Sequence, residues 1–131
     1  MKISRLALGL ALSTAIAAPA LAGDLGKVGI SVGSLGNPFF VATIKGIEDK
    51  AKSLNPSVQV TSVSSDYDLN KQFTQVDNFI AAGTNVLMVN AVDPKAIEPA
   101  VKKAQAAGMV VAAFDVAAAG ADVTVDRKSV V

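Results

Sequence analysis

The sequence of 131 residues contains no cysteine, no histidine and no tryptophan. Without cysteine the chain can form neither a disulfide bond nor a thiolate nucleophile, and it has no thiol to which a lipoprotein anchor could be attached. Without histidine, Ser-His-Asp and Cys-His catalysis and histidine-ligated metal sites are excluded within this chain. These absences remove many hydrolytic and metal-dependent chemistries.

Charge is also sparse, and the two signs are nearly balanced. Only 18% of the residues are charged, with 12 basic against 11 acidic side chains. Two of the basic residues, Lys2 and Arg5, lie at the N-terminus, so the rest of the chain has 10 basic and 11 acidic residues. This balance predicts no basic surface for nucleic acid or an anionic membrane. The 51% hydrophobic content is typical of a folded domain and not of a disordered chain.

The first 22 residues have the organisation of a cleavable export signal. Basic residues, an apolar stretch, a proline and a small-residue exit follow in this order: Lys2 and Arg5, Leu6–Ala17, Pro19, and Ala20-Leu21-Ala22. The apolar stretch is shorter than the about 20 residues that span a bilayer, and no later stretch reaches that length. We expect a signal peptide at residues 1–22, with a buried N-terminal helix as the alternative, and a mature chain that begins at Gly23.

From Asp24 onward, short β-branched apolar runs alternate with helical patterns. Predicted strands lie at 28–32, 58–63, 86–89, 110–114 and 123–125, and predicted helices at 38–54, 69–82 and 94–107. This alternation is typical of βαβ units and predicts an α/β fold, three αβα layers with a parallel sheet covered on both faces. The continuous apolar strands at 86–89 and 110–114 are expected at the sheet centre, and 58–63 near an edge.

Polar residues, prolines and glycines mark the predicted helix ends. The pairs Asn37-Pro38 and Asp93-Pro94 each combine an N-cap residue with a proline suited to the first helical position. Asp68 is expected to cap the second helix. Gly83 and Gly108 are expected to end the second and third helices.

Polar and aromatic residues gather where predicted strands end. Ligands of open parallel sheets bind outside the carboxyl ends of the strands, and there the sequence has Asn37, Phe39, Phe40, Asn90 and Asp115. Amides and a carboxylate suit the hydroxyls of a sugar, while aromatic rings suit its C–H face. None of these groups needs a shifted pKa, so we expect binding of a monosaccharide and no catalysis, with no cofactor and no metal ion.

Each of these residues also has a structural alternative. Asn37 can act as a helix cap, as a ligand contact or as both. Phe40 lies on the apolar stripe of its helix and is expected to pack in the core, whereas Phe39 lies off the stripe and is the better ring for stacking. Asn90 and Asp115 can serve simply as turn residues.

Three motifs resemble one family. The segments GSLGNPFF (33–40), NAVDP (90–94) and AAFD (112–115) resemble the periplasmic ribose- and galactose-binding proteins, the type I solute-binding components of ABC importers. The resemblance extends from about Lys27 to Val125. It implies a periplasmic location, binding of a pentose or hexose, and delivery to an ABC permease of the inner membrane. It also implies ligand contacts from the five residues named above, although Val116 stands where pentose binders have an arginine.

The resemblance covers only the first of the two lobes of that family. Residues 126–131 differ from the family pattern. We therefore expect an incomplete N-terminal lobe at 23–125 followed by an atypical tail at 126–131, and a truncated remnant without ligand binding stays as the alternative.

Two other functions are disfavoured. A nucleotide-dependent enzyme is not supported, because Gly29, Gly33 and Gly36 do not have the G-x-G-x-x-G spacing of a dinucleotide site. A LacI-type repressor shares the fold but would have a DNA-binding helix-turn-helix in place of the export signal. The paired carboxylates Asp66 and Asp68 are expected to form a turn and a helix cap, and no acid–base pair.

Overall fold

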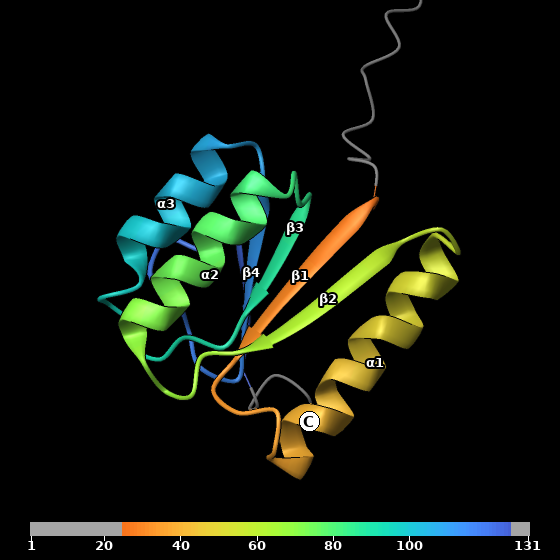
Figure 1. Ribbon diagram of the computed structural model, residues 1–131, viewed down its shortest axis with the longest axis horizontal. Helices are drawn as coiled ribbons and strands as arrows, with labels where there is room; N and C mark the ends of the chain where they lie inside the picture. The colour runs from red at the N-terminus through yellow and green to blue at the C-terminus, as the bar shows by residue number, and fades with distance from the viewer. Residues whose placement is uncertain (1–24, 127–131) are drawn as a thin grey trace, which may run out of the picture.

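The computed structural model describes residues 25–126. The predicted signal peptide and residues 127–131 of the predicted tail lie outside the described residues. The elements are β1 (Lys27–Val32), α1 (Pro38–Leu54), β2 (Gln59–Ser64), α2 (Leu69–Ala81), β3 (Val86–Val89), α3 (Glu98–Ala106), β4 (Val110–Phe114) and β5 (Val123–Val125) (Figure 1).

The described strands form one parallel sheet in the order β2-β1-β3-β4-β5. This confirms the predicted α/β class, and the observed strand bounds agree with the predicted ones to within one residue. As predicted, β2 lies at an edge and β3 at the centre. β1 pairs with both β2 and β3, so the strand order reverses at this point. A crevice outside the carboxyl ends of the strands is expected there.

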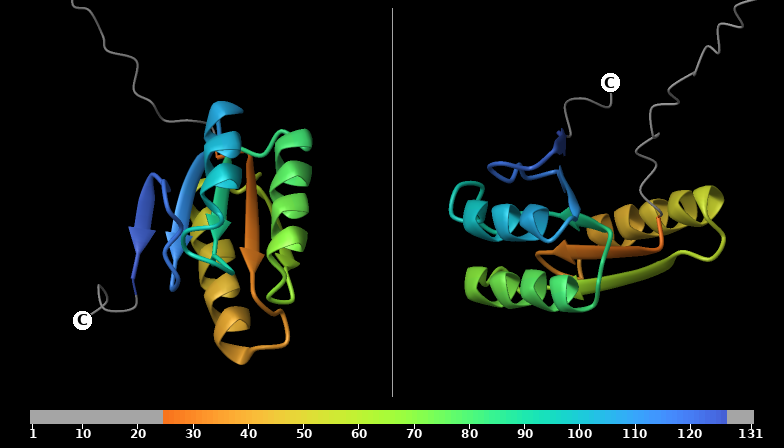
Figure 2. Two further views of the ribbon diagram at one scale, coloured as in Figure 1. Left: turned by 90° about the vertical axis from the view of Figure 1, so that its left-hand side faces the viewer. Right: turned by 90° about the horizontal axis from the view of Figure 1, so that it is seen from above.

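The helices cover both faces of the sheet (Figures 1 and 2). On one face, α2 and α3 pack over a core cluster that includes Leu87, Val89 and Val111. On the other face, α1 packs over a cluster that includes Ile30 and Phe114. The predicted three-layer arrangement is therefore present. Within residues 25–126, no helix combines the length and hydropathy that a membrane span requires.

The start of α3 differs from the prediction. Asp93 does not cap this helix; its Oδ1 accepts hydrogen bonds from the backbone N–H of Ala96 (2.8 Å) and Lys95 (2.9 Å), which close a separate turn. These two backbone hydrogen bonds also hold the pKa of Asp93 below its ordinary value. A helix that began at Pro94 would need the N–H of residue 99 to bond the carbonyl of Lys95, but residue 99 is proline. The carbonyl of Lys95 accepts from Glu98 N instead (3.2 Å), and α3 begins at Glu98.

Gly29 lies where β1 passes beneath α2. A Cβ atom on Gly29 would lie 2.7 Å from the ring of Phe79, which is buried. We predict that Gly29→Ala lowers the free energy of unfolding by about 1–3 kcal/mol, because the ring must shift within a packed core. Urea denaturation measures this change.

The control for that substitution is Gly46→Ala in α1, where a Cβ atom meets nothing within 4 Å. This change should raise the free energy of unfolding by about 0.5–1 kcal/mol, because alanine loses less backbone freedom than glycine in a helix. Equal stability of Gly29→Ala and the unmodified chain would contradict the prediction.

Candidate functional site

A hollow of about 510 Å³ opens at the carboxyl end of the sheet, beside the start of α1. All five residues predicted to bind ligand line it: Asn37, Phe39, Phe40, Asn90 and Asp115. The remaining lining residues are Tyr67, Ala91, Val92 and Val116. A smaller hollow of about 290 Å³ between α2 and β2 contains none of the predicted residues. The larger hollow lies where the strand order reverses and is the candidate site.

Asn37 is positioned by its role as the N-cap of α1. Its Oδ1 accepts a hydrogen bond from the backbone N–H of Phe39 at 3.0 Å, and its backbone is extended (φ −84°, ψ 120°). The predicted helix cap at this residue is therefore present. Because the cap uses only the side-chain oxygen, the amide nitrogen keeps its two donor hydrogens for a ligand at the hollow.

The two neighbouring rings have different environments. Phe40 is 5% exposed and belongs to the core cluster beneath α1, whereas Phe39 is 43% exposed. Their ring centroids are 5.3 Å apart at an interplanar angle of 66°, an edge-to-face contact. The buried ring of Phe40 thus packs against the ring of Phe39, and the exposed ring of Phe39 lines the hollow.

Asn90 and Asp115 contact each other across the ends of β3 and β4. Asn90 is buried, and its Nδ2 donates to Asp115 Oδ2 (3.2 Å) and to the carbonyl oxygen of Phe114 (3.3 Å). Asp115 has a left-handed backbone (φ 60°), a conformation that aspartate adopts more readily than most residues. Its N–H donates to the carbonyl oxygen of Val125 in β5 at 3.1 Å. The amide and the carboxylate are therefore held in place without a ligand.

Gln72 supports the site from α2, and the sequence interpretation missed it. This side chain is fully buried; its Nε2 donates to Ser31 Oγ (3.0 Å) and to the carbonyl oxygen of Asn90 (2.9 Å). Its Oε1 accepts from the N–H of Val92 at 2.9 Å. Gln72 therefore holds residues 90–92, the segment that follows β3, in place. All three residues of this segment line the hollow. The available signal was its position on the apolar stripe of α2, between Leu69 and Val76.

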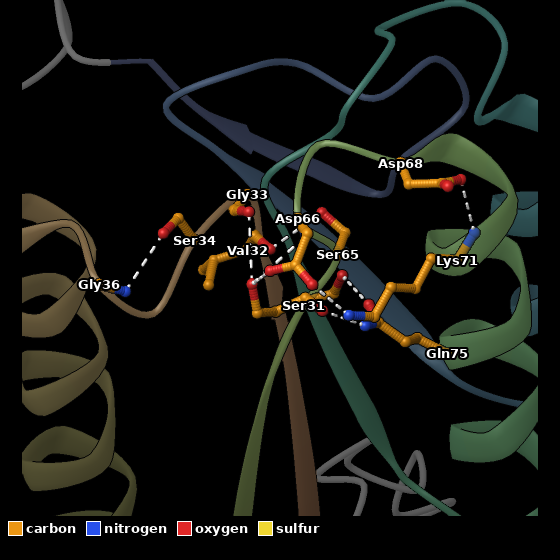
Figure 3. A network of polar contacts seen from close by, with 11 residues as sticks. Ser31, Val32, Gly33, Ser34, Gly36, Ser65, Asp66, Asp68, Lys71 and Gln75 are labelled. Carbon is orange, nitrogen blue, oxygen red and sulfur yellow. Dashed lines mark hydrogen bonds and ion pairs between the residues drawn. The ribbon is translucent and has the colours of Figure 1, made fainter.

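The loop between β2 and α2 forms a second polar network at the same end of the sheet (Figure 3). Asp68 Oδ1 accepts from the N–H of Lys71 at 3.0 Å and caps α2. Asp66 pairs with Lys71 Nζ and accepts from Ser64 Oγ at 2.6 Å. The hydrogen bonds from Lys71 and Ser64 hold the pKa of Asp66 below its ordinary value. The predicted turn and cap are both present, and Tyr67 lies between these two carboxylates.

Comparison with known proteins identifies the family. Residues 28–129 match the model of the periplasmic binding protein domain. The chain belongs to this family, whose members include the substrate-binding components of sugar transporters.

Relatives and solved structures agree with this assignment. The ribose import binding protein RbsB of Bacillus subtilis is 40% identical over 88 residues, which are 67% of this chain and 28% of that protein. RbsB of Escherichia coli is 32% identical over 114 residues, 87% of this chain and 37% of that protein. The myo-inositol binding protein of Caulobacter superimposes with a TM-score of 0.66 at 29% identity, over 79% of this chain and 34% of that chain. The chain therefore spans about a third of the length of these proteins.

We predict that Gln72→Met lowers the free energy of unfolding by about 1–3 kcal/mol, because the N–H of Val92 loses its buried acceptor. Gln105→Met is the matched control, since Gln105 donates to Gly120 and Asp122 in solvent-exposed bonds. Its effect should stay within about 0.5 kcal/mol. Urea denaturation of both variants measures the difference. An equal decrease in the free energy of unfolding of the two variants would show that the buried hydrogen bonds of Gln72 do not stabilise the fold more than the exposed ones of Gln105.

Proposed function

We propose that this chain supplies the N-terminal lobe of a periplasmic sugar-binding protein of an ABC importer. The lobe would correspond to residues 23–125, exported by a signal peptide at 1–22 and followed by an atypical tail at 126–131. The ligand would be a pentose or hexose, delivered to a permease in the inner membrane. The observation that carries this proposal is the convergence of two amides, a carboxylate and an exposed aromatic ring in one hollow of a periplasmic binding protein domain.

The lining suits recognition of neutral hydroxyl groups. Asp115 accepts hydrogen bonds from two ligand hydroxyls, and the amide nitrogen of Asn37 donates to a ligand oxygen. The amide nitrogen of Asn90 already donates to Asp115 and Phe114, so Asn90 accepts from a ligand hydroxyl through its side-chain oxygen. Phe39 offers an aromatic face to the C–H side of the sugar ring. These hydrogen bonds and this stacking contact bind a ligand without transferring a proton or breaking a covalent bond. Among residues 25–126, no cluster of three or more acidic side chains is arranged to hold a metal ion.

The expected affinity of this lobe by itself is low. The hollow is open, and Val116 offers apolar surface at a position where pentose binders, by the resemblance noted above, have an arginine. A few hydrogen bonds and one stacking contact support a Kd on the order of 1 mM, which corresponds to about 4 kcal/mol of binding free energy.

The test is a titration of the isotopically labelled chain with ribose, allose, glucose and myo-inositol, followed by amide NMR shifts. We expect saturable shifts at residues 37, 39, 40, 90–92 and 115–116, with the other amides unchanged. A dispersed spectrum that no sugar perturbs up to roughly 10 mM, ten times the expected Kd, would overturn the proposal. That outcome would favour a remnant without ligand binding.

Substitution of the two rings should separate binding from stability. Phe39→Ala is expected to weaken sugar binding by roughly three- to tenfold with little change in melting temperature, because this exposed ring stacks on the ligand. Phe40→Ala is expected to lower the free energy of unfolding by about 3–5 kcal/mol, because it empties a core position. Thermal melts and the NMR titration measure the two effects. Unchanged sugar binding in Phe39→Ala together with a loss of stability would show that Phe39 is not the stacking ring.

A further inference from the structure

Tyr67, the single tyrosine of the chain, lies at the rim of the same hollow, on the loop between β2 and α2. This residue is 60% exposed, although it carries a large aromatic ring. No prediction from sequence placed it at the site. Its ring is therefore accessible to a ligand that occupies the hollow.

The backbone that carries Tyr67 is held in an unfavourable conformation. Asp66 and Tyr67 both have left-handed φ angles, 52° and 58°, although neither is glycine. Aspartate adopts this region more readily than most residues, but tyrosine rarely does, and such conformations persist where the surroundings determine them, often at ligand sites. The strained backbone of Tyr67 at the rim of a hollow therefore points to a function for its side chain.

Bonds on both sides of Tyr67 fix this loop (Figure 3). Before it, Ser65 donates to the carbonyl oxygen of Val32 through its N–H (2.8 Å) and its Oγ (3.0 Å). After it, the N–H of Asp68 donates to the carbonyl oxygen of Ser65 at 2.9 Å. The pairing of Asp66 with Lys71 and Ser64 adds a third anchor. The ring of Tyr67 is thus presented from a backbone tied to both β1 and α2.

A glycine at the end of β1 makes room for the ring. A Cβ atom on Gly33 would lie 2.3 Å from Cε1 of Tyr67 and 2.8 Å from its Cδ1. Gly33 is not among the residues with positive φ, so the backbone at this position accepts alanine. An alanine side chain at position 33 would therefore displace the ring of Tyr67.

We propose that Tyr67 is a second aromatic contact for the ligand, which packs on the C–H surface of the sugar, and that Gly33 positions its ring. This inference rests on the proposed sugar binding. It assigns to the site a residue from a fourth βα loop, the one after β2, in addition to the loops after β1, β3 and β4.

The test is a double-mutant cycle with sugar affinity as the readout. Tyr67→Ala should weaken binding by roughly three- to tenfold, the range of one aromatic contact, while Tyr67→Phe keeps the ring and should bind within about twofold of the unmodified chain. Gly33→Ala should also weaken binding, because it displaces the ring. In the Tyr67→Ala background, Gly33→Ala should have no further effect on affinity. Leu35→Ala is the control, since Leu35 is 42% exposed but does not line this hollow.

A direct contact provides a second readout. Because the chain has one tyrosine, its ring protons are identifiable, and magnetisation transfer from them to sugar C–H protons should be seen in the unmodified chain. Unchanged affinity in Tyr67→Ala, or absence of this transfer while the sugar binds, would overturn the inference and leave the proposed function intact. A further loss from Gly33→Ala in the Tyr67→Ala background would overturn the role of Gly33. Absence of sugar binding by the unmodified chain would instead overturn the proposed function itself.

Discussion

The pairing of β1 with both β2 and β3 is the constraint on which the rest of the structure depends. The chain moves outward from β1 to β2 and then returns across β1 to β3. Because crossovers between parallel strands are right-handed, these two opposite movements place α1 and α2 on opposite faces of the sheet. The helix after β3, α3, lies on the same face as α2. The loops after the neighbouring strands β1 and β3 therefore leave the sheet toward opposite faces, and residues of both loops line the hollow at this point.

Buried polar side chains fill the space behind this opening. Ser31 Oγ donates to Gln75 Oε1 at 2.9 Å, and Gln75 Nε2 donates to the carbonyl oxygen of Ser64 at 2.7 Å. Gln72 extends the network to the segment after β3. Apolar packing alone would leave the backbone groups at these strand ends without partners, which is costly in a buried setting. Gln72 and Gln75 of α2 therefore link the carboxyl ends of β1, β2 and β3 through hydrogen bonds.

The sequence predicted what depends on local or periodic signals. Strand bounds followed from β-branched runs, and the caps at Asn37 and Asp68 followed from short-range chemistry. Asn90 and Asp115 were predicted to meet because the carboxyl ends of parallel strands lie at one edge, whatever their distance in sequence. The start of α3 was predicted wrongly, because the cap signal at Asp93 competes with a proline that removes a helical hydrogen bond five residues beyond Pro94.

The features that escaped prediction depend on partners distant in sequence. The role of Gln72 is set by the N–H of Val92, and the place of Tyr67 is set by the missing side chain of Gly33. Neither relation has a periodic pattern, and the backbone at Tyr67 adopts a conformation that its residue type disfavours. Such contacts follow only once the sheet order is known.

The groups at the hollow are ordered before any ligand arrives. The cap orients Asn37, Phe40 supports Phe39, and the bond from Asn90 holds the carboxylate of Asp115. The entropy of fixing these side chains is lost on folding and not on binding. Under the proposed sugar binding, affinity would then be limited by the number of contacts and not by their arrangement. A second surface that closed over the same ligand would add its contacts to a half-site that needs no rearrangement, which is the condition under which added contacts contribute most to affinity.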